Sequence, residues 1–321
     1  MTFIIDVKNE GRTVLSFLKS SLKISSSVLA VLKRDEKGIL ANGEHVTVRY
    51  VLKQSDVLSI NEKDSEDSIN ESIEPHDLPL NVIFENDDIM VIDKPANMPT
   101  HPSHGHTDDT LANAVAQRYK ERGDIFVFRP IGRLDKNTSG ISLIAKNAIS
   151  ASYLSFARRH GAIHKRYIAI LDGEIKGDNE LQIIDSYMKR MENSVIVRCV
   201  GDENEEGSFR ALTHWRLIWS GNGISVVEAI PQTGRTHQLR VHFAYIGHPI
   251  LGDDIYGKPH ELIDRHALHA ASLSIPIPYT DIDCLTEFSS APPPDMQKAF
   301  MTITGLDLNK IILSNQGKEQ K

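Results

Sequence analysis

The sequence predicts an α+β fold with a mixed, mainly antiparallel sheet. Its 321 residues, of which 40% are hydrophobic and 25% charged, have the composition of an ordinary globular protein of about two domains. Segments with strand patterns and turn signals are interspersed with segments of helical pattern. They lack the regular strand–helix–strand repeat of a parallel sheet, so hairpins should dominate.

Residues 1–60 are expected to fold as a small module with a net charge of +3. Hydrophobic periodicity predicts two helices and then two strands, at 13–18, 26–33, 45–50 and 57–60. A turn at Asn42-Gly43 precedes the strands. Residues 61–79 are predicted to be a linker, because the stretch 61–80 has seven acidic residues, one lysine and few apolar side chains.

A large domain is expected over residues 80–305, followed by a C-terminal tail over 306–321. Its first two strands, 81–85 and 89–93, flank an acidic turn at 86–88, which indicates a hairpin. Three further strands are predicted at 141–145, 167–171 and 224–230, and three helices at 111–119, 150–159 and 236–246.

The net charge of −7 hides a strong local asymmetry. Residues 118–170 contain 11 Lys or Arg against 3 Asp or Glu, although the whole chain has a pI near 6.1. A polyanion responds to the local field, since salt screens exposed charges beyond about 10 Å. The basic stretch indicates either a solvated helix face or a surface that binds a polyanion.

Several classes of protein lack their sequence signals. The two cysteines, Cys199 and Cys284, form no CxxC pair, and the short apolar run at the N-terminus contains Asp6. No stretch approaches the roughly 18 apolar residues of a membrane span. We therefore expect a cytoplasmic protein with no membrane partner.

We also expect neither a nucleotide cofactor nor a metal. The chain has no GxxxxGK[ST], GxGxxG or GxSxG motif. His101, His104 and His106 lie on a loop interrupted by Pro102 and Gly105, without an acidic or Cys partner at ligand spacing.

The stretch 129–140 (RPIGRLDKNTSG) places one carboxylate, Asp135, between Arg133 and Lys136. Nearby cations keep an aspartate ionised, as a nucleophile or a base requires. The alternative is an ordinary turn or capping aspartate ahead of an apolar strand.

The stretch 231–240 (PQTGRTHQLR) joins a predicted strand to a predicted helix, with Thr236 as the expected N-cap. Free backbone N–H groups at a helix start, together with the guanidinium of Arg235, suit a phosphate group. The alternative is a capped helix start without a ligand.

These two segments, in this order, resemble the RluA family of pseudouridine synthases. The family's catalytic stretch HRLDxxTSG is matched by GRLDKNTSG at 132–140. Further blocks match at 92–95 (IDKP), 100–103 (THPS), 165–167 (KRY), 233–242 (TGRTHQLRVH), 248–253 (HPILGD) and 268–270 (LHA). The resemblance extends over about residues 80–300. Residues 1–60 resemble the αL RNA-binding module that often precedes this domain, through the turn at Asn42-Gly43 and the stretch 56–58.

Two positions depart from the family pattern. Gly132 stands where the family usually has a His, so any grip of that imidazole on RNA is missing or filled by another residue. Asn97 replaces a usual Gly, and Asn tolerates the left-handed backbone conformation.

The resemblance implies an isomerase that converts uridines in structured RNA, ribosomal or transfer, to pseudouridine without a cofactor. It assigns Asp135 as nucleophile or base toward the sugar, Arg235 as its charge partner and phosphate contact, and Tyr167 as a ring for the uracil or a base for its C5 proton. Leu239 and Ile141 are candidate apolar walls. The remaining expected substrate-binding residues are Arg133, Lys136, Thr138, Lys165, His237 and Arg240. We expect a monomer. The competing hypotheses are a noncatalytic RNA-binding protein and a metal-dependent hydrolase.

Overall fold

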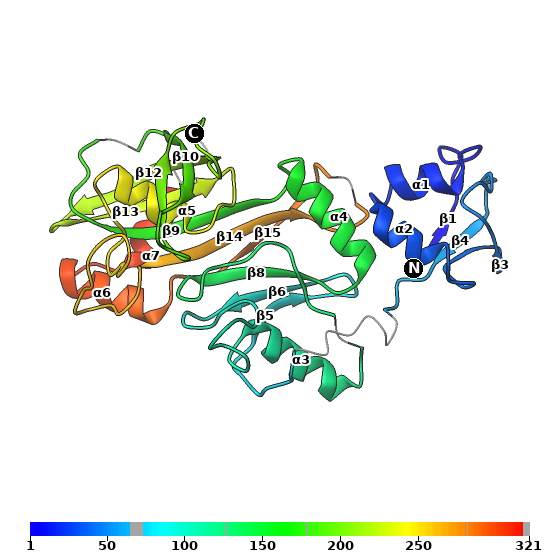
Figure 1. The fold of residues 1–321 in the computed structure, drawn as a ribbon, viewed down its shortest axis with the longest axis horizontal. Helices are drawn as coiled ribbons and strands as arrows, with labels where there is room; N and C mark the ends of the chain where they lie inside the picture. Colours follow the sequence, from blue (N-terminus) through cyan, green and yellow to red (C-terminus); the bar gives the residue numbers. More distant parts are fainter. Residues whose placement is uncertain (65–72, 126, 178, 281, 317–321) are drawn as a thin grey trace.

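The computed structural model describes residues 1–64, 73–125, 127–177, 179–280 and 282–316. Figure 1 shows a small unit at one end of the molecule and a larger unit built around a long sheet, with helix α4 (Ala148–Arg159) lying between them. Each unit contains both helices and strands, so the predicted α+β fold class is confirmed.

The small unit packs two helices on a four-stranded sheet of order β1-β4-β2-β3. Its elements are β1 (Thr2–Ile4), α1 (Val14–Ser20), α2 (Ser26–Leu32), β2 (Ile39–Ala41), β3 (Glu44–His45) and β4 (Val57–Ile60). The helices start at the caps Thr13 and Ser25, whose side chains accept backbone N–H groups. Asn42 and Gly43 both have positive φ, as a tight hairpin turn requires.

The strand predicted over 45–50 is wrong beyond His45. Strand β3 contains only Glu44 and His45, which pair with Ala41 and Leu40 of β2. Val46 and Val48 are instead partly buried against the core of the small unit from an irregular segment. These alternating apolar residues therefore contribute to the core without pairing with another strand.

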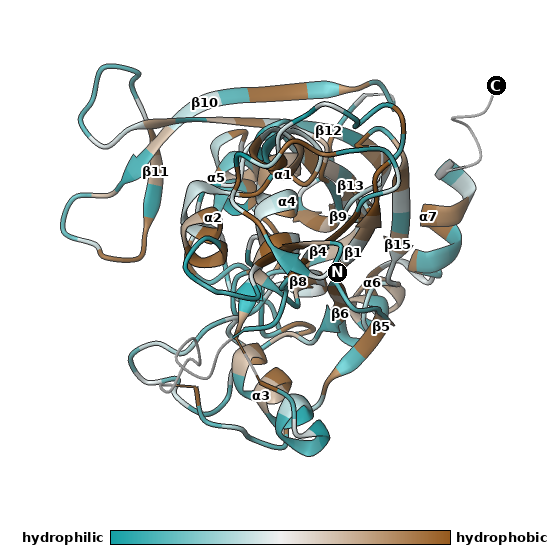
Figure 2. Cartoon of the chain, turned by 90° about the vertical axis from the view of Figure 1, so that its right-hand side faces the viewer, coloured by the Kyte–Doolittle hydropathy of each residue, from teal (hydrophilic) through white to brown (hydrophobic). Residues whose placement is uncertain are grey.

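The large unit contains an 11-stranded sheet of order β11-β10-β12-β13-β9-β14-β8-β6-β5, with β15 paired to β14 and β7 to β8. Its strands are β5 (Asn81–Glu85), β6 (Ile89–Lys94), β7 (Arg129–Pro130), β8 (Ser139–Ala145), β9 (His164–Asp172), β10 (Gln182–Arg190), β11 (Arg198–Gly201), β12 (Phe209–Gly221), β13 (Ile224–Pro231), β14 (Leu268–Pro276) and β15 (Leu285–Ser289). The β5–β6 hairpin is as predicted. In Figure 2, β10 and β11 extend as an arm from one side of the molecule.

One junction in this sheet is parallel. Strands β8 and β14 pair through two residues each, Ser139 with His269 and Gly140 with Ala270, whereas the other described pairings are antiparallel. Strand β14 therefore lies between β8 and β9 and joins the two halves of the sheet.

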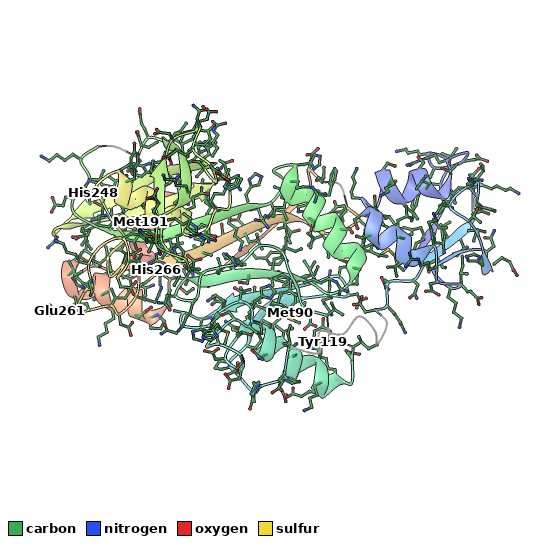
Figure 3. The ribbon with its side chains drawn as sticks, viewed as in Figure 1. Met90, Tyr119, Met191, His248, Glu261 and His266 are labelled. Atoms are coloured by element: carbon green, nitrogen blue, oxygen red, sulfur yellow. The ribbon has the colours of Figure 1, made fainter. Side chains whose placement is uncertain are left out.

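Helices cover the sheet. Besides α4, they are α3 (Leu111–Arg122), α5 (Gln238–Tyr245), α6 (Pro294–Thr304) and α7 (Leu308–Gln316). Met90 on β6 and Tyr119 on α3 meet in one buried cluster between sheet and helix (Figure 3). Among the described residues, no helix combines the length and the apolar character that crossing a membrane needs.

The tail expected from residue 306 is wrong over its first part, because α7 occupies most of it. Leu308 is fully buried and Ile312 is largely buried in the core beneath β12, so apolar burial holds this helix on the domain. Residues 317–321 lie outside the described residues.

The predicted linker is in contact with the large unit at both of its described ends. Asp64 forms an ion pair with Arg129 at 2.6 Å, and Ile73 and Leu78 pack against the cluster beneath α3. Its centre, 65–72, lies outside the described residues. The core of the small unit also includes Ile149 of α4, which links the two units directly.

Candidate active site

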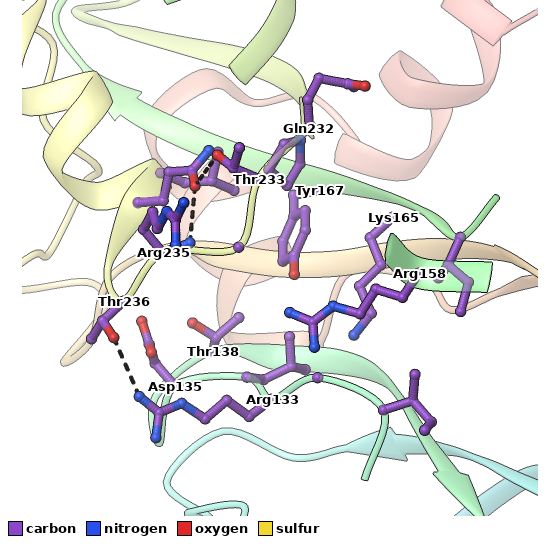
Figure 4. Close-up of a pocket in the computed structure, with 18 of the residues that line it drawn as sticks. Arg133, Asp135, Thr138, Arg158, Lys165, Tyr167, Gln232, Thr233, Arg235 and Thr236 are labelled. Atoms are coloured by element: carbon purple, nitrogen blue, oxygen red, sulfur yellow. Dashed lines mark hydrogen bonds between the residues drawn. The ribbon is translucent and has the colours of Figure 1, made fainter. Parts of the chain in front are cut away.

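The two motif segments meet in a cavity of about 930 Å³ beside the β8–β14–β9 junction. Residues 130–135, which lead toward β8, form one wall, and residues 231–240, between β13 and α5, form the opposite wall. Tyr167 of β9 projects between the two walls (Figure 4). The topology thus places three sequence-distant blocks around one space.

Asp135 lies in a tight turn whose backbone is fixed on both sides. The Thr138 amide donates to the Asp135 carbonyl at 3.1 Å, and the Thr138 hydroxyl lies 2.9 Å from Nε2 of His266. The hydroxyl of Thr100 donates to the Leu134 carbonyl. Within the described parts of the chain, the Asp135 carboxylate has no hydrogen bond or ion pair, and it faces the cavity (Figure 4). This carboxylate is therefore held in place by its backbone and available to a substrate.

Lys94 stabilises the same turn by hydrogen bonds to backbone carbonyl groups. Its fully buried ammonium donates to the carbonyl oxygens of Met98 and Lys136, at 2.9 and 3.2 Å. Burial, together with the charge of Arg265, lowers the pKa of Lys94 to about 7, against the opposing pull of Asp135. Sequence reasoning gave this lysine no separate role, although it belongs to the IDKP block.

Tyr167 occupies the centre of the sheet, where β9 pairs with both β13 and β14. Its ring is half-buried and lines the cavity. Burial and then the negative charge of Asp135 raise the pKa of Tyr167, so its hydroxyl is protonated at neutral pH.

Lys165 precedes Tyr167 by two residues and so points to the same face of β9. Its ammonium donates to the Ile141 carbonyl at 3.0 Å, and burial together with the charge of Arg158 lowers its pKa to about 8. Ile141 itself is fully buried in the core and does not line the cavity, contrary to its expected role as a wall. Leu239 does line it and is largely buried.

Arg235 lines the cavity, but the expected ion pair with Asp135 is absent from the described structure. Its Nε donates to the Arg210 carbonyl at 3.1 Å, and its guanidinium lies 5.1 Å from the Phe209 ring centroid. These contacts hold the side chain against β12. Arg133 instead bridges the two walls, since its Nη2 lies 3.3 Å from Oγ1 of Thr236.

The start of α5 differs from the prediction that Thr236 is its N-cap. The capping position is His237, which has a positive φ of 58° and gives no side-chain cap. Oε1 of Gln238 instead accepts from the Arg235 amide at 3.0 Å and from the Thr233 hydroxyl at 2.7 Å. This glutamine therefore orders the loop that leads into α5, and the expected threonine cap is wrong.

His237 and Arg240 are positioned by partners that lie after the helix. Nδ1 of His237 is 2.9 Å from the Tyr256 hydroxyl, and burial lowers the pKa of this histidine. Arg240 is buried and makes two hydrogen bonds of 2.7 Å to the carboxylate of Asp253. Both side chains line the cavity.

Lys136, like Ile141, lies outside the cavity lining. Its ammonium lies 3.2 Å from Nε2 of His106, whose Nδ1 contacts Asp109 at 2.6 Å. His101 does line the cavity, with its ring 4.8 Å from that of Phe128. In the described parts of the chain, no group of three His, Cys, Asp or Glu side chains could hold a metal ion.

The cavity is strongly positive although the chain is acidic overall. Asp135 is the only carboxylate among its lining residues, against six cations. These are Arg133, Arg158, Arg159, Lys165, Arg235 and Arg240. A cleft lined by one sign of charge concentrates a polyanion at its mouth. Sequence reasoning missed Arg158 as a site residue, and its only signal was the basic stretch 118–170.

Comparisons with known proteins show the family to which the chain belongs. The family model of RNA pseudouridylate synthase matches residues 88–245. An uncharacterized RNA pseudouridine synthase of Bacillus subtilis, YjbO, is 34% identical over 277 residues, which cover 86% of this chain and 94% of that protein. The chain belongs to the RluA family of RNA pseudouridine synthases. It is an isomerase that converts uridines in RNA to pseudouridine, as the sequence predicted.

Two further relatives of this pseudouridine synthase are informative. Ribosomal large subunit pseudouridine synthase D of Zymomonas mobilis is 36% identical over 244 residues, covering 71% of this chain and 74% of that one. The solved structure of human RNA pseudouridylate synthase domain containing 1 has a TM-score of 0.56 at 24% identity, covering 74% of this chain and 94% of that one. The human structure confirms the fold.

Proposed function

We propose that Asp135 is the catalytic carboxylate of this pseudouridine synthase. The observation that supports it is that Asp135 is the only carboxylate lining a cavity otherwise rich in cations. The reaction breaks the bond between C1′ and N1 of uridine, turns the uracil and joins C1′ to C5. The C5 proton is then lost and N1 gains a proton, so the product is an isomer of the substrate. Asp135 acts on the sugar, either as a nucleophile at C1′ or as a base.

The other lining residues have distinct roles in this proposal. Tyr167 stacks on the uracil, since base–aromatic stacking contributes about 1–3 kcal/mol, and Leu239 closes the pocket around the base. The remaining side chains bind the RNA backbone and the sugar. They are Arg235, Arg133, Thr138, Lys165, His237 and Arg240, with Lys136 at the edge of the site.

The substrate class that we propose is the RNA of the large ribosomal subunit. Its support is the printed name of relatives such as the Zymomonas mobilis protein, which is 36% identical. The reaction needs no redox cofactor or nucleotide, because no electron and no phosphoryl group is transferred. We further propose that the enzyme acts as a monomer in the cytoplasm, where its RNA is found.

Residues 1–60 are proposed to be an RNA-binding module joined by the segment 61–79 to a catalytic domain. The positive charge of this module supports the proposal, as does its position against α4, whose last turn reaches the cavity. From there the module can hold structured RNA while the flipped uridine occupies the site. Flipping costs a few kcal/mol and least in single-stranded loops, which favours an RNA with an exposed uridine.

The proposal is tested with Asp135→Asn on RNA tritiated at uridine C5. Tritium release from an unmodified large-subunit ribosomal RNA transcript should fall at least about a thousandfold, because the reacting carboxylate is lost. Asp124→Asn removes an exposed carboxylate outside the cavity and should keep the parent rate. Parent-level release by Asp135→Asn would refute the catalytic role. Release from a transfer RNA pool, but not from the ribosomal transcript, would refute the substrate class.

A further inference from the structure

We propose that Arg158 binds an RNA backbone phosphate next to the flipped uridine and so orients the nucleotide on Asp135. Arg158 lies in the last turn of α4, and its side chain reaches into the cavity (Figure 4). The inference rests on the proposed function, because it takes Asp135 as the reacting group of the same cavity.

The guanidinium of Arg158 lies against both motif segments at glycine positions. A Cβ added at Gly132 would be 3.6 Å from its Nη1, and one added at Gly234 would be 3.0 Å from its Nη2. Gly132 has a φ of +82°, which other residues rarely adopt. The absence of side chains at these two positions leaves the guanidinium room between the walls that carry Asp135 and Arg235.

Arg158 differs from most other cations of the cavity in having no partner in the described structure. Arg133, Arg235, Arg240 and Lys165 each donate to a protein oxygen. Arg158 and its neighbour Arg159 have no such bond among the described residues, and only Arg158 approaches both glycines. Its uncompensated charge also lowers the pKa of Lys165, after the larger effect of burial.

A phosphate fits these observations best. The planar guanidinium presents paired N–H donors that match two phosphate oxygens, and a phosphate supplies the negative charge that the cavity lacks. Gly132 replaces the usual His of the family next to this guanidinium. A Cβ at position 132 would be in ordinary contact with the guanidinium, so Arg158 lies beside the place of that imidazole and provides a different cation for the same RNA.

The test measures binding of a fluorescent oligouridine of about ten nucleotides to the full chain. Phosphate contacts do not depend on sequence, so this probe reports on Arg158 whichever RNA is natural. Arg158→Ala should weaken binding about ten- to a hundredfold and reduce the salt slope by about 0.7, the contribution of one phosphate on a single strand. Arg158→Lys should keep the slope and recover part of the affinity.

Arg159→Ala is the matched comparison, since it removes the same charge one residue further along α4. It should cost clearly less affinity than Arg158→Ala. If the two variants lost the same affinity, the effect would come only from the overall positive charge of the cavity, and the proposal would be overturned. Parent-like binding by Arg158→Ala, or weaker binding at an unchanged salt slope, would also overturn it.

Gly234→Ala provides a second test that keeps the charge. The new methyl group would displace the Arg158 guanidinium by a few tenths of an ångström, because the two would be 3.0 Å apart. Gly234→Ala should lower the affinity for oligouridine in the parent, and it should have no effect when Arg158 is already Ala. Full additivity of the two losses would refute the contact. Tritium release by Asp135→Asn is a separate measurement, so failure of the proposed function and failure of this inference are distinguishable.

Discussion

At the scale of single residues, the proposed chemistry depends on a carboxylate with a fixed backbone and a tyrosine that holds its proton. Asp135 has no protein partner in the described structure, and the turn that carries it is tied down by Thr138 and Lys94. The raised pKa of Tyr167 means that its hydroxyl cannot act as a phenolate near neutral pH. Its oxygen can still accept a proton if its own proton moves to a neighbouring acceptor.

The two roles of Tyr167 are separated by Tyr167→Phe and Tyr167→Leu. The Phe variant keeps the ring and should release tritium at least about a hundredfold more slowly, because the acceptor of the C5 proton is lost. The Leu variant, which also lacks stacking, should be slower still. For the parent, the raised pKa predicts no increase in rate between pH 7 and 9, since the tyrosine stays protonated throughout.

Tyr245→Phe is the control, because Tyr245 is exposed on α5 outside the cavity, and it should behave like the parent. A Phe variant with nearly the parent rate would assign Tyr167 to stacking alone. Parent-level turnover by the Leu variant would remove it from the mechanism.

Short sequence motifs and the family resemblance predicted residues that the fold brings to one cavity. Asp135, Tyr167 and Arg235 were predicted this way, and all three line the cavity. Arg158 could not be predicted, because its place depends on the angle at which α4 meets the two walls. The expected bond between Arg235 and Asp135 is absent for a related reason. Phe209 and the Arg210 carbonyl hold the guanidinium against β12, a strand that the sequence did not predict.

At the scale of elements, the parallel β8–β14 junction positions the site. Gly140 has a φ of +107°, and a Cβ there would come within 2.7 Å of the Ala270 backbone nitrogen. The two strands can approach only because this position has no side chain. The Asp135 turn is thereby held at a fixed distance from β9 and Tyr167.

Gly140→Ala should therefore destabilise the fold by about 3 kcal/mol or more, since a backbone clash adds to conformational strain. Urea unfolding measures the change. Gly43→Ala is the matched control, because Gly43 also has a positive φ, +86°, but open space around it. It should lose only about 1 kcal/mol from strain. Equal losses for the two variants would contradict a special role for the junction.

Elements with a strong local pattern were predictable, including the 81–93 hairpin, α1 to α5 and the buried strands β8, β9 and β13. Those that depend on distant partners were not. The pairing of β14 with β8 joins residues far apart in sequence, and α7 becomes visible only when the core that receives Leu308 is known. The strand predicted over 46–50 is wrong for the same reason, because an alternating pattern forms a strand only where another strand is available to pair with it.

At the scale of the whole molecule, the two units have separate cores joined through α4. Ile149 of α4 belongs to the buried core of the small unit, and Tyr279 of the large unit packs against that core. The Ser25 amide also donates to the Ser152 hydroxyl of α4 at 3.2 Å. Ile73 and Leu78 belong instead to the core beneath α3.

A chain beginning at Ile73 should consequently stay folded and release tritium, with weaker affinity for structured RNA. Gel-shift titration and the tritium assay measure the two properties. Truncation exposes Ile149, so Ile149→Thr in the shortened chain keeps the test possible if the unmodified form aggregates. Unchanged RNA affinity, or loss of folding in both shortened forms, would contradict a separable RNA-binding module.

The position of β14 also affects how the protein is made on the ribosome. The Asp135 turn leads into β8 and Tyr167 lies on β9, yet β14, the strand between β8 and β9, is synthesised later and ends only at Pro276. During translation the two strands have no completed junction until this late segment leaves the exit tunnel. A nascent chain therefore lacks a formed uridine pocket, and it becomes competent to modify RNA only after β14 has left the exit tunnel.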